Sequence, residues 1–225
     1  MVDRLNAPDA DWVAVDRYIA EHLIRDDPSD VLAANQAAGL PDIDVSPAQG
    51  KMLHLFALMC GARRILEVGT LGGYSTIWLA RALPEDGRIV TLEIDPHHAS
   101  IARRNLDGAG VGHLVDIRVG PAIDSLDAMV AQGEGPFDLV FVDADKINNV
   151  AYVRAALALT RPGATILVDN VIREGQVLDE ASGDARVAGT RALFEMVAAE
   201  PRLSATAVQT VGGKKWDGFL MAVVQ

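Results

Sequence analysis

Cysteine, basic clusters and long apolar runs are scarce in this 225-residue chain, and each shortage narrows what the protein can be. The single cysteine, Cys60, cannot form an internal disulfide, and its apolar surroundings favour an inert core side chain over a nucleophile. The formal net charge of −11 has no basic run to offset it, which argues against a nucleic-acid partner. No apolar run approaches the ~20 residues of a membrane span, and residues 1–11 lack the features of a secretion signal. We therefore expect a cytoplasmic protein, without a membrane partner, that acts on small molecules.

No linker rich in proline, serine or glycine divides the chain, so we expect a single domain over residues 1–225. Half of the residues are hydrophobic, which is enough for a sizeable core. Residues 1–45 are expected to form a helical and loop cover, with a helix over residues 11–25 and a loop over residues 26–44. Residues 46–225 are expected to form the cofactor-binding and catalytic core. Its first helix is predicted to begin at Ser46-Pro47, with Gln49 as a capping-box residue.

The stretch over residues 65–80 combines a short apolar strand, a glycine-rich turn and the start of a helix. In an open α/β sheet, ligands bind where such strands end. Gly69, Gly72 and Gly73 allow the backbone to come close to a ligand. The helix that starts near Ser75 offers free N–H groups and a positive dipole end to an anionic group. The turn therefore predicts a ligand that carries a carboxylate or a phosphate.

The spacing of the glycines narrows the choice of ligand. A dinucleotide fingerprint needs glycines at its first, third and sixth places, but counting from Gly69 this chain has Leu71 and Tyr74 there. Glu67 precedes the first glycine by two residues, where it suits an ammonium group better than a pyrophosphate. Glu93 ends the next predicted strand, residues 88–93, and is placed to accept hydrogen bonds from both ribose hydroxyls. Adenosine joined to an amino acid is S-adenosylmethionine.

These two segments resemble the first two motifs of the class I methyltransferases. The segment from Phe137 to Lys146, FDLVFVDADK, and the later pair Asp169-Asn170 resemble the metal-dependent O-methyltransferases of the catechol and caffeoyl-CoA type. The resemblance runs from about Val45 to the C-terminus. It implies the α/β Rossmann-like class I methyltransferase fold, a mostly parallel, doubly wound sheet of seven strands with the last one reversed.

The resemblance also implies a function: methyl transfer from S-adenosylmethionine to a hydroxyl of an aromatic small molecule with a vicinal diol. A homodimer is expected from the family and from the apolar face of residues 11–25. Two alternatives stay open, a nicotinamide-dependent oxidoreductase and a module that binds S-adenosylmethionine without turnover. By the same resemblance the turn Gly120-Pro121-Ala122 forms the adenine pocket. The full set of expected cofactor-binding residues is Glu67, Gly69, Gly72, Gly73, Ser75, Glu93, Ile94, Pro121, Ala122 and Asp143.

Three oxygen donors at two predicted strand ends, Asp143, Asp169 and Asn170, suit a hard divalent cation: Mg²⁺, with Mn²⁺ or Ca²⁺ as alternatives. The residues alone equally allow Asp143 to cap the following helix and Asp169-Asn170 to form an Asx turn. The resemblance favours the metal, because the three positions match the metal ligands of the family.

Lys146 matches the family lysine at the substrate hydroxyl, so we expect it to act with Asp143 in catalysis, as a base or an orienting donor. A solvated loop lysine is the alternative. The family usually has tyrosine where this chain has Asn149, which affects substrate or interface packing. Trp216 belongs to an expected hairpin loop over residues 212–218, either as part of the acceptor pocket or as a hydrophobic plug. The residue patterns do not identify the acceptor itself.

Overall fold

The computed structural model describes residues 10–225. The first nine residues, which belong to the expected N-terminal cover, lie outside the described part. A seven-stranded sheet has the order β3-β2-β1-β4-β5-β7-β6, and only β7 runs against the others. This confirms the predicted fold class with its reversed last strand. The strands are β1 Arg64–Val68, β2 Arg88–Glu93, β3 Val115–Val119, β4 Phe137–Val142, β5 Thr160–Asp169, β6 Leu203–Gly212 and β7 Lys215–Val224.

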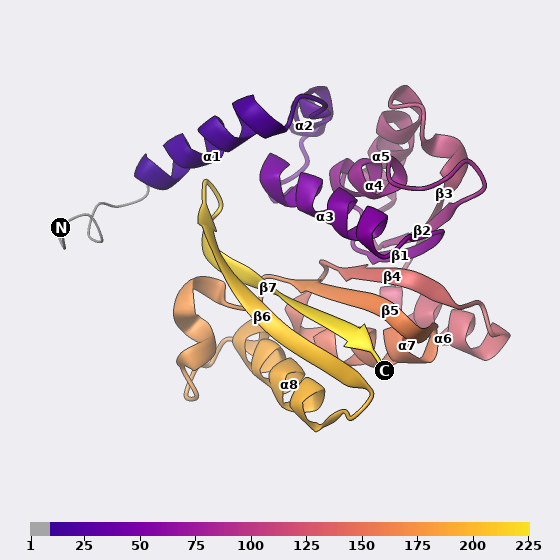
Figure 1. Cartoon of the computed structure of the whole chain (residues 1–225), viewed down its shortest axis with the longest axis vertical. Coiled ribbons are helices and arrows are strands. Elements are labelled where there is room, and N and C mark those ends of the chain that lie inside the picture. The colour runs from indigo at the N-terminus through magenta and orange to yellow at the C-terminus, as the bar shows by residue number, and fades with distance from the viewer. Residues whose placement is uncertain (1–9) are drawn as a thin grey trace.

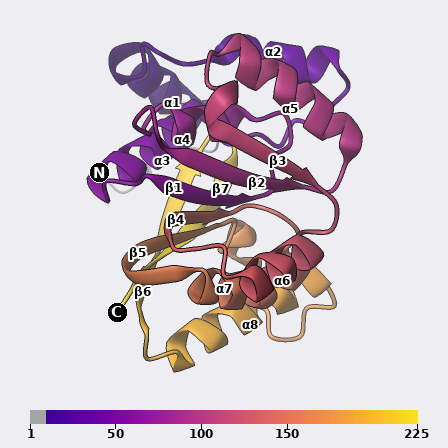
Figure 2. The ribbon, with the colours of Figure 1, turned by 90° about the vertical axis from the view of Figure 1, so that its right-hand side faces the viewer.

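Helices cover both faces of the sheet, as Figures 1 and 2 show. On one face lie α3 (Pro47–Met59), α4 (Tyr74–Ala80) and α5 (Pro96–Gly108), with α1 (Ala10–Leu23) and α2 (Ser29–Ala37) outside them. On the other face lie α6 (Ala122–Gln132), α7 (Asn149–Ala158) and α8 (Ala185–Ala199). The described residues also contain three short 3₁₀ segments, η2 (Gly112–Leu114), η3 (Lys146–Asn148) and η4 (Arg173–Leu178). None of the helices in residues 10–225 has the length and apolar character needed to cross a bilayer.

The central strand β4 is apolar on both sides because it lies between two cores. Leu139 and Phe141 pack into the core under α3, α4 and α5, whereas Val140 and Val142 pack into the core under α6, α7 and α8. A parallel strand covered on both faces is expected to be a continuous apolar run, and this one is.

The pairing of the strands brings the candidate residues to one rim. Val68 of β1 is in register with Leu92 of β2 and with Val142 of β4. The residues that follow these three positions, Gly69, Glu93 and Asp143, therefore emerge side by side at the carboxyl ends of the strands. The sequence order of the strands does not show this adjacency, but the parallel register requires it.

Two expectations were wrong in detail. Residues 26–44 are not all loop, because α2 forms there and buries Val31 and Asn35. The hairpin loop is also shorter than expected: β6 and β7 pair down to Gly212 and Lys215, so Trp216 lies in β7.

Between α2 and α3, residues 38–46 form a connecting segment that we call the strap. It runs along the rim where the strands end.

Candidate active site

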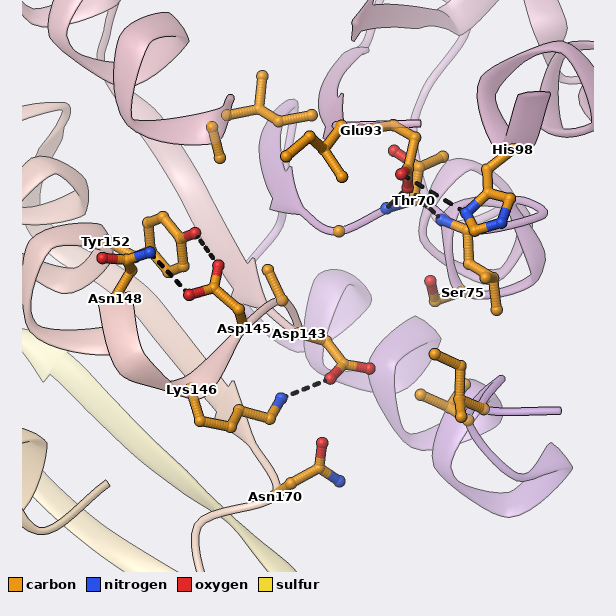
Figure 3. A pocket seen from close by; sticks show the side chains of 18 of the residues that line it. Thr70, Ser75, Glu93, His98, Asp143, Asp145, Lys146, Asn148, Tyr152 and Asn170 are labelled. Carbon is orange, nitrogen blue, oxygen red and sulfur yellow. Dashed lines mark hydrogen bonds and ion pairs between the residues drawn. The ribbon is translucent and has the colours of Figure 1, made fainter. Parts of the chain in front are cut away.

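A cavity of about 710 Å³ opens at the carboxyl ends of β1, β2 and β4 (Figure 3). The strap, the glycine turn after β1 and the segment after β4 form its walls. Its lining residues are Ile43, Asp44, Val45, Gly69, Thr70, Leu71, Ser75, Leu92, Glu93, Ile94, His98, Ala122, Asp143, Ala144, Asp145, Lys146, Asn148, Tyr152 and Asn170.

The three glycines of the turn have different reasons to be glycine. Gly69 lines the cavity at a φ of +101°, and a Cβ there would overlap the backbone carbonyl of Asp143, so only glycine lets β1 pass the end of β4. Gly72 lies against Asn35 of α2, with no room for a side chain. Gly73 has a φ of +84° where α4 begins. Gly72 and Gly73 do not line the cavity, so their predicted contact with the ligand is replaced by a role in packing and turn geometry.

Glu93 lies in the cavity wall and also holds the glycine turn in place. Its side chain is 7% exposed. One carboxylate oxygen accepts hydrogen bonds from the N–H groups of Thr70 (3.2 Å) and Leu71 (2.8 Å), and the other accepts from the N–H of Asp95 (2.9 Å). A ring nitrogen of His98 lies 3.7 Å from the second oxygen. Glu93 thus lines the cavity and stabilises the glycine turn, and its contact with a ribose stays a prediction.

Glu67 does not reach the cavity, although the sequence predicted a direct contact with an ammonium group. The residue has no exposed surface, and its carboxylate accepts hydrogen bonds from the hydroxyls of Ser75 (2.7 Å), Thr76 (2.5 Å) and Thr91 (2.7 Å). Burial raises its pKa to about 7. Ser75 does line the cavity. Glu67 does not line the cavity itself, but its hydrogen bond from the hydroxyl of Ser75 orients that side chain, which does.

The remaining cofactor positions lie at the far end of the cavity. Ile94 and Ala122 line it, whereas Pro121 precedes α6 and lies outside the lining.

Sequence reasoning missed Tyr152, which is buried and donates its hydroxyl to Asp145 (Figure 3). Asn148 donates to the same carboxylate at 2.7 Å. Asp145 therefore fixes Tyr152 and Asn148, and within residues 10–225 the ammonium of Lys146 bonds to Asp143 and not to Asp145. No local motif marks Tyr152, because helix α7 alone brings it back to the cavity.

The opposite end of the cavity holds the candidate catalytic residues. Nζ of Lys146 donates to Oδ1 of Asp143 at 2.8 Å, and the amide of Asn170 points toward this pair (Figure 3). Lys146 is 7% exposed, so its ammonium is held inside the structure and is not a solvated loop cation. Asn170 has a φ of +58°, a left-handed conformation that asparagine tolerates. Its side chain makes no hydrogen bond within residues 10–225, which leaves the amide oxygen available.

Asp169 lies beside this group, only 4% exposed. Its Oδ2 accepts from Nε2 of Gln49 at 2.6 Å, and its Oδ1 accepts from the N–H of Asn170 at 2.8 Å. Gln49 thus contacts a candidate metal ligand, and its side chain does not complete the capping box predicted for it. Burial, and next the negative charge of Asp143, raise the pKa of Asp169.

The donor set fits a divalent cation in kind. Two carboxylates and an amide oxygen are hard ligands of the type that Mg²⁺, Mn²⁺ and Ca²⁺ prefer. No group of three or more histidine, cysteine, aspartate or glutamate side chains gathers in the described part of the chain, so a site here depends on the oxygen of Asn170. Asp143 itself caps no helix: η3 follows Asp145, and α7 follows Asn148.

Trp216 and Asn149 are the two uncertain positions of the sequence analysis. Trp216 donates from its indole N–H to Gln209 at 3.0 Å, lies against Gly175 of η4 and does not line the cavity. This placement favours the hydrophobic plug. Asn149 is fully buried, and neither its amide oxygen nor its nitrogen has a hydrogen-bond partner in the described residues.

Comparison with known proteins gives concordant matches. A family model described as O-methyltransferase matches residues 24–220. The catechol O-methyltransferase of Mycobacterium tuberculosis is 53% identical over 98% of this chain and 97% of its own, and that of Niastella koreensis is 50% identical over 94% and 97%. The structure of an O-methyltransferase from Bacillus cereus in complex with S-adenosylhomocysteine has 55% identity and a TM-score of 0.94, covering 96% of this chain and 99% of that one. An O-methyltransferase from Streptomyces achromogenes in complex with S-adenosylmethionine has 47% identity and a TM-score of 0.94, covering 97% and 99%.

Proposed function

The chain belongs to the O-methyltransferase family and is an S-adenosylmethionine-dependent enzyme, and we propose that it methylates one hydroxyl of an aromatic vicinal diol with the help of a divalent cation. The family match removes the nicotinamide-dependent oxidoreductase and the module without turnover as alternatives. Two relatives of about 50% identity are named catechol O-methyltransferases, which supports the diol as acceptor.

We place S-adenosylmethionine in the cavity of about 710 Å³. Its ribose would lie at Glu93 and its adenine between Ile94 and Ala122, which face the same space. Its methionine end would lie at Ser75 and Asp143, the hydroxyl and the carboxylate that line the other side. This orientation directs the methyl group toward Asp143, where the candidate catalytic residues gather.

The observation that carries the proposal is the group of Asp143, Asn170 and Lys146 that lines the cavity, with Asp169 buried beside Asn170. We propose that Asp143, Asp169 and Asn170 hold the cation. When bound, a divalent cation there would hold both oxygens of a diol and favour loss of the proton from the one to be methylated. Lys146, fixed by its 2.8 Å bond to Asp143, would donate to the acceptor oxygen or take its proton. The remaining contribution of the protein is to fix the distance and angle between the oxygen and the methyl group.

A paired-substrate assay tests this proposal. We expect a 3,4-dihydroxy aromatic ring to be methylated with a kcat/KM at least about a hundredfold above that of its 4-hydroxy counterpart, because the second oxygen supplies orientation worth several kcal/mol. Excess chelator should abolish the reaction of the diol and leave binding of S-adenosylhomocysteine intact. Equal rates on both rings, or full activity in chelator, would require a different acceptor or a metal-free mechanism.

We also propose that the enzyme is a homodimer. Helix α1 exposes several apolar side chains, among them Val15 (55%), Tyr18 (62%) and Leu23 (71%). Covering such a surface with a second copy removes apolar area from water. Light scattering at micromolar concentration should give twice the mass of the chain, and a monomer mass would count against the dimer.

A further inference from the structure

Asn35 is a polar side chain in a place where apolar residues are usual. It lies on α2, is 2% exposed, and takes no part in the site described above. A buried amide is tolerated only when its donors and acceptors are paired. The partners of Asn35 are therefore informative.

The amide of Asn35 joins the strap to the glycine turn. Its Nδ2 donates to Oδ1 of Asp44 in the strap at 3.0 Å. Its Oδ1 accepts from Nδ2 of Asn105 on α5 at 2.8 Å, and the same nitrogen of Asn105 donates to the carbonyl oxygen of Gly72 at 2.8 Å. The main-chain carbonyl of Asn35 also accepts from the N–H of Leu40, in the strap, at 3.0 Å.

Both ends of this connection lie at the cavity. Asp44 and Val45 form part of its wall, and the turn that contains Gly72 forms part of its floor. Asn35 itself does not line the cavity, so any effect on the ligand must act through these two segments. The glycine turn and helix α2 are in close contact, since a Cβ at Gly72 would overlap the amide of Asn35.

We propose that Asn35 is a positioning residue for the cofactor, which holds the strap against the glycine turn so that Asp44 and Val45 close over bound S-adenosylmethionine. The inference rests on the proposed place of the cofactor in this cavity. An amide suits the position because it donates to a carboxylate and accepts from a second amide at once, which neither a carboxylate nor an apolar side chain can do. Loosening the strap should weaken cofactor binding without altering the catalytic residues, which lie at the carboxyl ends of β4 and β5 and on η3.

The test exchanges donor and acceptor. Asn35→Asp replaces the donor with a second carboxylate facing Asp44, and we expect the affinity for S-adenosylhomocysteine, measured by calorimetry, to fall at least about tenfold, the scale of a hydrogen bond to a charged group. The double variant Asn35→Asp/Asp44→Asn restores one donor and one acceptor in reversed order, and the new carboxylate still accepts from Asn105. It should return the affinity to within about threefold of that of Asp44→Asn alone, the reference that allows for Asp44 itself lining the cavity.

Gln36→Asp is the matched control. It adds the same charge at the next position of α2, on an exposed side chain, and should leave the affinity unchanged. Steady-state kinetics supply a second readout: Asn35→Asp should raise KM for S-adenosylmethionine while kcat at saturating cofactor stays within about twofold. A purely structural defect would instead lower the active fraction and hence kcat.

The outcomes separate the two proposals. If the unaltered protein fails to bind S-adenosylhomocysteine, the proposed function fails. If it binds and Asn35→Asp binds equally well, or if the double variant stays more than about threefold weaker than Asp44→Asn, the positioning role is overturned. Should Asn35→Asp not fold, Asn35→Ser, which removes the donor without adding charge, carries the test, and an unchanged affinity there overturns the role.

Discussion

The two ends of the cavity hold their carboxylates in different ways. At the cofactor end, Glu93 is bound by three backbone N–H groups, and Glu67 by three hydroxyls. These donors are all neutral, and they come from the glycine turn, from strand β2 and from the starts of helices α4 and α5. At the catalytic end, Asp143 is bound by the ammonium of Lys146, and Asp169 by the side-chain amide of Gln49 and the backbone N–H of Asn170.

This difference indicates which end of the cavity needs an added cation to balance its carboxylates. The carboxylates of the cofactor end are held by neutral donors of the protein itself, backbone N–H groups for Glu93 and hydroxyls for Glu67. The catalytic end places two carboxylates close enough for the charge of Asp143 to raise the pKa of Asp169. Such a pair is stabilised by added positive charge, which a divalent cation would supply. The two ends should therefore respond differently to substitution and to metal removal.

The largest expected effect is at the catalytic end. Asp169→Asn keeps the shape of the side chain and removes a charged metal ligand, so we expect the rate of diol methylation to fall roughly a thousandfold, because a lost ligand removes several kcal/mol of charge stabilisation. Calorimetry should show weaker Mn²⁺ binding and an unchanged affinity for S-adenosylhomocysteine. If both affinities fell together, the two ends would not be separable as described.

Glu93→Ala probes the cofactor end with a smaller effect. We expect S-adenosylhomocysteine to bind about 1.5–3 kcal/mol more weakly, the scale of hydrogen bonds to a charged group. Because Glu93 also holds the backbone of Thr70 and Leu71, the loss has two causes. An analogue without ribose hydroxyls separates them: it should lose much less affinity on the same substitution. An equal loss for both ligands would assign Glu93 to turn geometry alone.

The cofactor end could be predicted more fully because its residues are close in sequence. Gly69 and Ser75 come shortly after β1, and Glu93 ends the neighbouring strand β2, so simple spacing rules place them together. The catalytic end needed the resemblance to a known family, since Asp169 and Asn170 alone are equally typical of an Asx turn.

Contacts between distant segments could not be predicted. Helix α2 has little apolar periodicity, burying only Val31 and Asn35, so nothing in the sequence distinguished it from a loop. Gln49 looked like a capping residue, but it lies 120 residues before its partner Asp169. The glycines and lysines around Trp216 are typical of a loop, but the pairing of β6 with β7 continues to Gly212 and Lys215 and so includes Trp216.

The smallest expected effect concerns the carboxylate beneath the cofactor end. Burial raises the pKa of Glu67 from 4.5 to about 7, so between these values the folded chain retains a proton that the unfolded chain releases. The stability that this proton contributes is fully present below pH 4.5 and is lost as the pH rises to about 7. Glu67→Gln is neutral at every pH and removes this dependence. Between pH 5 and 7, the free energy of unfolding should therefore shift in favour of the variant by roughly 2 kcal/mol relative to the original chain. Urea denaturation without ligand across this range measures the shift, and two parallel curves would show that the three hydroxyls keep Glu67 ionised in the folded protein.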